Sequence, residues 1–445
     1  MTHQETDTII ALSSGQGRSG IAVVRISGPK SDKILKQLTH FRLPAPRKAA
    51  TRWLHDRDGV RFDEALILRF SAPNSFTGED CAEIHCHGSP AIVEAILIEA
   101  TRLKKVRLAE RGEFSRRAFE NGKLDLLQAE GIADLIDANS IAQMKQAARF
   151  VGGDASERIE TWRKIILEAS AFLAASIDFS DEGDVGEDAH APVVGLIDEL
   201  VSEFNAALTD AKSASRIRDG LRIAILGKPN AGKSTLINAL AKRDAAIVSD
   251  IPGTTRDVLE THIVLNGVPV TVADTAGLRL TDDPIEAEGV KRARRWAEDA
   301  DIRIFLTRAD DDIGDRPTEL GPNDIWVISQ ADRADSELFP NDVDLSLAVA
   351  TGKGMDTLGS ILLQKVVGLT SSDEAPTVVR LRHIESLNES LAALQRAKAL
   401  LMEIGDVDLA AFELSIARTS LDQILGHLDV EDILGEVFSG FCVGK

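Results

Sequence analysis

The chain has 445 residues, of which 44% are hydrophobic, and its formal net charge is −20 at pH 7. This length is expected to hold about two to four domains, so a single-domain protein is excluded. The acidic balance excludes a generally basic face for nucleic acid. Any nucleic acid is therefore expected to bind at a local basic patch or mainly through a partner protein.

The sequence lacks the features of a secreted or membrane protein. Its three cysteines are an odd and sparse set, which suits a reducing compartment better than a disulfide framework. Residues 1–10 have no basic region followed by an apolar run. No stretch approaches the ~20 apolar residues that span a bilayer. We expect a soluble, cytoplasmic protein with no membrane contact.

The first half of the chain changes character near residue 121. Residues 1–120 mix alternating apolar runs, at 21–26 and 65–70, with turn residues, which predicts an α+β domain. Helical spacing then begins and includes a long proline-free run at 142–177. We predict that residues 121–216 form the first part of an all-α helical domain.

The second half returns to short β-type runs and then to helical spacing. The expected strands are residues 221–226, 268–273, 302–306 and 325–328. Their alternation with helices predicts a mostly parallel sheet covered by helices, a Ras-like α/β domain at residues 217–375. Helical spacing resumes in residues 376–445. The simplest architecture is an α/β domain inserted into the helical domain.

Residues 227–234, with the sequence GKPNAGKS, match the phosphate-binding pattern G-x-x-x-x-G-K-[ST]. A predicted strand leads into the loop and a predicted helix, 235–241, leads out, which is the context that the motif requires. Backbone N–H groups can surround the phosphates, while Lys233 supplies charge and Ser234 a hydroxyl for Mg²⁺. The nucleotide contacts expected here are Asn230, Ala231, Gly232, Lys233, Ser234 and Thr235.

Two further motifs follow in the order that phosphate-loop hydrolases use. Asp274 is expected to hold Mg²⁺ through water and Gly277 to sense the γ-phosphate, while Thr255 can complete the Mg²⁺ shell from a switch loop. Taken alone, Asp274 at a strand end is more often a turn former or a helix cap. The expected nucleotide contacts are Ser249, Asp250, Ile251, Pro252, Gly253, Thr254, Thr255, Asp274, Thr275, Ala276 and Gly277.

The base should be selected by residues 329–332, SQAD, which stand where guanine-binding proteins have Asn-Lys-x-Asp. Asp332 can accept two hydrogen bonds from the guanine edge, which adenine cannot donate, so GTP is predicted over ATP. Ser329 is shorter than Asn, and Gln330 lacks the charge of Lys. We therefore predict weaker nucleotide binding than an intact motif gives.

Several stretches lie outside the motifs that GTPases in general share. They are residues 20–28 (GIAVVRISG), 74–80 (NSFTGED), 112–115 (GEFS), 121–126 (NGKLDL) and 441–445 (FCVGK). In addition, Leu278 stands where many GTPases have a water-orienting glutamine. With these features the chain resembles the MnmE (TrmE) family of tRNA modification GTPases over essentially its full length.

The resemblance implies a reaction and its partners. Family members form homodimers through N-terminal domains that bind a formyl-tetrahydrofolate, here expected to be 5-formyltetrahydrofolate or a related one-carbon folate. With the FAD protein MnmG they build an aminomethyl-type group, carboxymethylaminomethyl or aminomethyl, at C5 of the wobble uridine of certain tRNAs. The main alternative is a ribosome-assembly GTPase that binds rRNA, although such proteins usually add a basic domain.

The resemblance also implies folate contacts at Arg25, Glu83, Lys123 and Lys445. Basic side chains can pair with the folate carboxylates, and Glu83 can accept hydrogen bonds from the pterin ring. Lys123 is alternatively a solvated charge in the first turn of a helix. Cys442 matches a cysteine suspected of a catalytic part in the modification, and it is alternatively a small residue near the folate pocket.

Hydrolysis in this family depends on a K⁺ ion that takes the place of an arginine finger, while the GTP-binding domains pair across the nucleotides. The matching K⁺ ligands are Asn230 through its side chain and backbone oxygens of Ser249, Ile251 and Thr254. Glu286 matches the glutamate that positions the attacking water through another water. Glu288 is its local rival, and both are also typical of an exposed acidic helix start.

Two other groups of side chains could be functional sites, but each also has a purely structural explanation. Cys81, Glu83, His85 and His87 would share one strand face, but their spacing fits no standard zinc pattern. A basic cluster could contact tRNA, although a solvated face explains it better. The cluster consists of Lys104, Lys105, Arg107, Arg111, Arg116 and Arg117.

Overall fold

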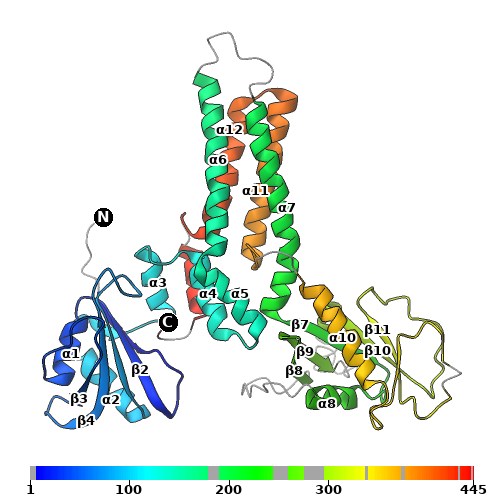
Figure 1. The fold of residues 1–445 in the computed structure, drawn as a ribbon, viewed down its shortest axis with the longest axis horizontal. Helices are drawn as coiled ribbons and strands as arrows, with labels where there is room; N and C mark the ends of the chain where they lie inside the picture. The colour runs from blue at the N-terminus through cyan, green and yellow to red at the C-terminus, as the bar shows by residue number, and fades with distance from the viewer. Residues whose placement is uncertain are drawn as a thin grey trace, which may run out of the picture. The chain divides into compact units, whose positions relative to one another are not determined.

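The structure is a computed structural model that describes residues 7–178, 190–243, 259–274, 295–335, 339–371, 376–428, 431–441 and 444. The chain forms two compact units, which are described separately (Figure 1). The first contains Met1–Ala133, Phe150–Gly186 and Ala392–Lys445, and the second contains Asp134–Arg149 and Glu187–Leu391. No helix among the described residues has both the length and the apolar composition needed to cross a membrane.

A six-stranded sheet in the order β3-β4-β5-β2-β1-β6 begins the first unit. Neighbouring strands are antiparallel except β1 and β6, which run parallel. Apolar side chains of two helices cover one face of the sheet, Ile34 and Leu38 from α1 and Ile96 from α2. The elements are β1 (Thr8–Leu12), β2 (Ser19–Ser27), α1 (Ser31–Thr39), β3 (Ala50–His55), β4 (Arg61–Phe70), β5 (Cys81–Gly88), α2 (Pro90–Thr101) and β6 (Val106–Leu108).

Helices complete the first unit, and α6 packs against α12 along its length (Figure 1). Phe438 and Phe441 pack on Leu126 of α4, so the segment from residue 431 returns to the N-terminal half of the unit. The Ser13 hydroxyl donates to the Gly444 carbonyl at 2.8 Å. The elements are α3 (Glu113–Glu120), α4 (Leu126–Asp137), α6 (Asp154–Asp178), the π-helix η3 (Leu400–Ile404), α12 (Val407–Leu425) and α13 (Glu431–Ser439).

The second unit combines three helices with an α/β layer. The helices are α7 (Ala191–Asp219), α5 (Ile141–Gly152) up to residue 149 and α11 (Leu381–Ala399) up to residue 391. The Gln146 amide donates to the carbonyl of Ala214 at 3.0 Å, which links α5 to α7. The continuous helical run expected at 142–177 is interrupted, because Gly153 adopts a φ of 92° between α5 and α6.

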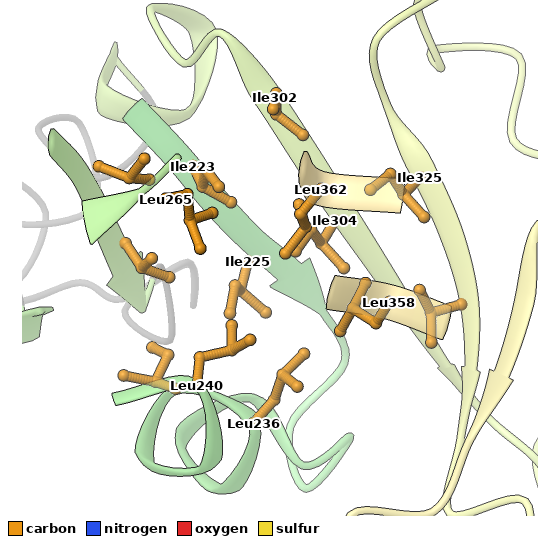
Figure 2. Close-up of a cluster of buried hydrophobic side chains, with 14 of the residues drawn as sticks. Ile223, Ile225, Leu236, Leu240, Leu265, Ile302, Ile304, Ile325, Leu358 and Leu362 are labelled. Atoms are coloured by element: carbon orange, nitrogen blue, oxygen red, sulfur yellow. The ribbon is translucent and has the colours of Figure 1, made fainter. Parts of the chain in front are cut away.

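The α/β layer is a sheet in the order β12-β11-β10-β7-β9-β8, parallel except for the β8–β9 pair. Figure 2 shows its core, in which Leu236 and Leu240 of α8 face Ile225 of β7, while Leu358 and Leu362 of α10 lie near Ile304. The elements are β7 (Leu221–Gly227), α8 (Lys233–Arg243), β8 (Leu259–Leu265), β9 (Val268–Asp274), β10 (Ile302–Arg308), β11 (Ile325–Ser329), β12 (Leu345–Leu347) and α10 (Met355–Thr370).

These elements confirm the predicted fold class. The chain has an α+β N-terminal part, a set of long helices and a Ras-like α/β part, and helices precede and follow the α/β part in sequence. The expected strands at 221–226, 268–273, 302–306 and 325–328 all fall within strands of the second sheet. Strand β8 and strand β12 were not foreseen. The four domain boundaries proposed above remain predictions.

Candidate nucleotide site

The phosphate loop lies between β7 and α8, at the edge of the sheet where the parallel strands end. Buried side chains fix both flanks, because Ile223 and Ile225 of β7 pack with Leu236 and Leu240 of α8. Gly227 has a φ of 146°, and a Cβ there would lie 2.5 Å from the Leu306 carbonyl oxygen. Only glycine therefore fits where the strand enters the loop.

Lys233 is the buried cation of this loop, with an exposed fraction of 8%. Its ammonium group donates to the carbonyl oxygens of Gly227 at 2.9 Å and Lys228 at 3.2 Å. The charge is thus directed into the loop rather than into solvent. Together with the N-terminus of α8, it provides the positive potential that a phosphate group requires.

Asp274 ends β9 beside the strand that feeds the phosphate loop. In the parallel register of β7 and β9, Asp274 pairs with Ile225, two residues before Gly227. Its backbone therefore lies at the same sheet edge as the loop. The role of its carboxylate toward Mg²⁺ stays a prediction, as does that of the Ser234 hydroxyl.

The base-reading segment follows β11, and each of its polar residues has a different environment. The Ser329 hydroxyl is buried and donates to the Thr307 carbonyl at 3.3 Å, so it is directed toward β10. The Gln330 amide donates to the Asn230 carbonyl of the phosphate loop at 2.9 Å. Asp332 is exposed. The segment thus reaches the phosphate loop and presents its carboxylate to solvent.

A second loop at the same edge was missed by the sequence reasoning. It follows β12 and begins at Ala348, whose N–H donates to the Lys353 carbonyl at 3.0 Å. The N–H of Ala331 donates to the Leu347 carbonyl at 3.0 Å, which ties the base-reading segment to β12. The sequence Thr351-Gly352-Lys353-Gly354 after an alternating apolar run was the available indication of this tight turn.

Many of the expected site residues lie outside the described residues. The group includes the switch residues, the catalytic glutamate and the last positions of the chain other than Gly444. Their roles stay predictions. They are Ser249, Asp250, Ile251, Pro252, Gly253, Thr254, Thr255, Thr275, Ala276, Gly277, Glu286, Cys442 and Lys445.

In the first unit, the structure brings Arg25 and Glu83 together. They pair directly across β2 and β5, and the Arg25 guanidinium donates to the Glu83 carboxylate at 3.1 Å. Arg25 also lies over the rings of Phe76 at 5.3 Å and Phe114 at 5.8 Å. Both charged side chains keep 19% exposure. A half-open cation beside a half-open acceptor suits a ligand that has both carboxylates and ring N–H groups.

Lys123 lies over a glycine of the Asn74–Asp80 stretch. A Cβ at Gly78 would lie 3.2 Å from the Lys123 Cε atom and 3.1 Å from the Asn121 Cβ atom. The Asn121 amide donates to the Thr77 carbonyl at 2.7 Å, which fixes this crossing. The Lys123 stem thus lies close to Gly78 while the residue is exposed, and both a folate contact and a solvated charge remain open for it.

The histidines of β5 are occupied by carboxylates within the sheet. His87 contacts Asp63 at 2.6 Å, and His85 contacts Glu83 at 3.3 Å. Cys81 lies 3.1 Å from the Thr77 hydroxyl. Among the described residues, no group of three His, Cys, Asp or Glu side chains has the arrangement of a metal site.

Three arginines of the basic cluster near residue 110, Arg107, Arg116 and Arg117, form ion pairs. Arg117, with a side-chain exposure of 9%, contacts Asp7, Glu79 and Glu113. Arg107 contacts Glu113 at 2.6 Å. Burial raises the pKa of Glu113, but hydrogen bonds from Arg107, the Glu110 backbone and Arg117 outweigh this effect and lower it. A structural network therefore explains Arg107 and Arg117 better than a tRNA surface.

The Ras-like sheet and the phosphate loop between β7 and α8 together define a nucleotide-binding protein of the phosphate-loop hydrolase class. The family model "GTP-binding protein TrmE N-terminus" matches residues 8–123, and "MnmE helical domain" matches residues 126–442. The chain belongs to the MnmE (TrmE) family of tRNA modification GTPases and is a GTPase.

The relatives in this family match the chain from end to end. The tRNA modification GTPase MnmE of Hyphomonas neptunium is 47% identical over 439 residues, covering 99% of each chain. The MnmE of Caulobacter vibrioides is 48% identical over 456 residues, covering 99% of this chain and 100% of the relative. The resemblance seen in the sequence is thereby confirmed.

Proposed function

We propose that this protein binds and hydrolyses GTP to drive modification of tRNA in the cytoplasm. In this proposal it acts as a homodimer with the FAD protein MnmG. Together they install a carboxymethylaminomethyl or aminomethyl group at C5 of the wobble uridine, with a one-carbon unit taken from 5-formyltetrahydrofolate. Family membership supports the tRNA and GTP parts of this statement.

The main support is the meeting of three loops at one edge of the second sheet. The phosphate loop after β7, the base-reading segment after β11 and the turn after β12 all lie at carboxyl ends of parallel strands. Ligands bind at this edge in open α/β sheets. Lys233 faces the phosphate position, and Asp332 is available to the guanine edge.

For hydrolysis, we propose that Mg²⁺ is held by Ser234 and Thr255 with Asp274 acting through water. K⁺ would be bound by the Asn230 side chain and by backbone oxygens of Ser249, Ile251 and Thr254. A cation at the β–γ bridge would stabilise the charge that develops there during phosphoryl transfer. Glu286 would orient the attacking water. This assignment also explains how the protein hydrolyses GTP with Leu278 in place of a glutamine.

For the folate, we propose that Arg25 and Lys123 bind the carboxylates and that Glu83 accepts from the pterin ring. The ion pair between Arg25 and Glu83, in which both side chains are partly exposed, supports this proposal. Lys445 is placed in the same site, and the contact between Ser13 and Gly444 supports that placement, since Ser13 follows the strand that pairs with β2. Cys442, three residues before Lys445, is proposed as a catalytic thiol.

The decisive experiment is mass spectrometry of wobble uridine in tRNA from cells that lack this protein. We expect loss of the aminomethyl-type modification, restored by the wild-type gene and not by a Lys233→Ala variant, since that variant lacks the phosphate-loop cation. Unaltered nucleosides in the deletion strain would contradict the proposed reaction. An rRNA-processing defect with normal tRNA would favour the ribosome-assembly alternative.

A further inference from the structure

Gln330 connects the base-reading segment to the phosphate loop. Its side-chain Nε2 donates to the Asn230 carbonyl oxygen at 2.9 Å, across 100 residues of sequence. A carbonyl oxygen can only accept, so the amide nitrogen and not the amide oxygen must face Asn230. The other atom of this amide, Oε1, is buried and has no hydrogen-bond partner among the described residues.

Both ends of this connection have an unusual backbone conformation. Asn230 has a φ of 64° and Gln330 a φ of 56°, both in the left-handed region that non-glycine residues seldom adopt. Two such residues that touch each other are held there by the surrounding contacts. For Asn230, the contacts are the Gln330 amide and the loop hydrogen bond from the Ala231 N–H to the Lys228 carbonyl at 3.2 Å.

The segment that carries Gln330 is itself fixed. The Ala331 N–H donates to the Leu347 carbonyl at 3.0 Å, and the Arg333 N–H donates to the Gln330 carbonyl at 3.0 Å. Ser329, immediately before it, is buried against Thr307. The Gln330 amide therefore extends from a rigid turn, and it can hold the more open Asn230 peptide in one orientation.

We propose that Gln330 is a positioning residue that fixes the Asn230 peptide and so couples guanine binding to the geometry of the phosphate loop. The Asn230 side chain is the K⁺ ligand in the proposed function, on which this second consequence rests. A displaced Asn230 peptide would turn that side chain away from the cation. Gln330 would thus affect nucleotide affinity and the response of GTP turnover to K⁺, without contacting either phosphate or K⁺.

Three substitutions in the full-length protein separate the hydrogen bond from Gln330 to the Asn230 carbonyl from other roles of Gln330. Gln330→Met keeps the length but removes the donor, and Gln330→Glu replaces it with a carboxylate that repels the Asn230 carbonyl. Gln330→Lys retains a donor. The matched control is Gln364→Met, on the exposed side of α10.

The first readout is the affinity for a fluorescent GDP analogue, titrated in NaCl without K⁺. We expect about a threefold to tenfold loss of affinity in Gln330→Met and Gln330→Glu, the size of one lost hydrogen bond, and wild-type or higher affinity in Gln330→Lys, which restores the lysine of the guanine motif. The Gln364→Met control should match the wild type. Wild-type affinity in Gln330→Met, or an equal loss in Gln330→Lys, would overturn the proposal.

The second readout is the K⁺ concentration that gives half-maximal GTP turnover. We expect this concentration to rise about threefold or more in Gln330→Met and to stay near the wild-type value in Gln330→Lys. An unchanged value in Gln330→Met would refute the coupling to the cation. If the wild-type protein itself shows no preference for K⁺ over Na⁺, the proposed cation mechanism fails, while the affinity measurement in NaCl still decides whether the link exists.

Discussion

Arg25 and Glu83 face each other across β2 and β5, with the guanidinium 3.1 Å from the carboxylate and both side chains 19% exposed. The rings of Phe76 and Phe114 lie 5.3 and 5.8 Å from the guanidinium carbon. The pair is thus mostly buried but accessible, and Arg25 can donate charge-assisted hydrogen bonds to the carboxylate of a ligand.

Arg25→Met should therefore weaken binding of 5-formyltetrahydrofolate to the full-length protein. We expect a loss of about 10- to 100-fold, because hydrogen bonds to a charged group contribute about 1.5–3 kcal/mol. Isothermal titration calorimetry measures the effect. Arg57→Met is the matched control, since Arg57 is 69% exposed in a surface pair with Asp58. Equal affinities in the two variants would remove Arg25 from the folate site.

Asp332→Asn should change which base is bound. The carboxylate accepts two hydrogen bonds from guanine, whereas an amide offers one acceptor and one donor and so clashes with one guanine N–H group. We expect GTP affinity to fall by at least about tenfold and affinity for xanthosine triphosphate, which has a carbonyl at that position, to rise. Competition binding measures both. Asp335→Asn, exposed in the same segment, should leave both unchanged.

GTP turnover should be faster in K⁺ than in Na⁺ at equal ionic strength. The Asn230 side chain is the proposed ligand that distinguishes the two ions, so Asn230→Ala should make the rates equal. Phosphate release measured in the two salts tests this expectation. A variant that keeps the wild-type ratio of rates would show that Asn230 does not bind the ion.

Arg117→Met should destabilise the first unit by about 3 kcal/mol, because it leaves Asp7, Glu79 and Glu113 without their shared cation. Urea unfolding measures the loss. The control Arg116→Met removes an arginine that is 48% exposed and should cost under about 1 kcal/mol.

The effect of Arg117 should also depend on pH. Its hydrogen bonds help to lower the pKa of Glu113 below 4.5 and that of Asp7 below 3.8 in the folded protein, against the opposing effect of burial. The resulting stability is present above the unfolded-state pKa values and is lost as pH falls through the folded ones. The difference between Arg117→Met and wild type should shrink below about pH 4. A constant difference would mean that Arg117 acts by packing alone.

Cys86 gives a prediction at the opposite end of the pH range. Burial, with a smaller effect of the Asp63 charge, raises the pKa of this thiol from 9.0 to about 11. Unfolding therefore releases a proton between these values, and stability falls as pH rises, by at most about 1.4 kcal/mol per pH unit. Urea unfolding at about pH 8 and about pH 10 should show a smaller decrease for Cys86→Ala than for wild type. Equal decreases would contradict the shift.

The sequence was sufficient for those parts of the site that are continuous in the chain. The phosphate loop needs only eight adjacent residues between a strand and a helix, so its position between β7 and α8 could be anticipated. The sequence predicted that Arg25 and Glu83 contact the same folate, but it did not predict that they contact each other. Their direct contact depends on the register of β2 and β5, which no local pattern determines.

Contacts between distant segments could not be predicted. Gln330 was judged by the charge it lacks, whereas the structure shows its amide on Asn230, a contact that depends on the packing of β7, β10 and β11 side by side. Strand β12 has only three residues, so the short alternating run and the glycines after it were a weak indication of the turn. The ion pairs of Arg117 with Asp7 and Glu79 join segments far apart in the sequence and could not be foreseen, whereas its pair with Glu113 at i,i+4 on α3 was a local indication.

The contact between Ser13 and Gly444 has a consequence for synthesis on the ribosome. Thr8–Leu12 and Ser19–Ser27 emerge first and can pair as soon as they leave the exit tunnel. Phe438, which fills the space beside Gly112, and Gly444, which meets Ser13, are added more than 300 residues later. The nascent N-terminal sheet therefore lacks these contacts until residues 438–444 have been synthesised, and it cannot reach its final packing before then.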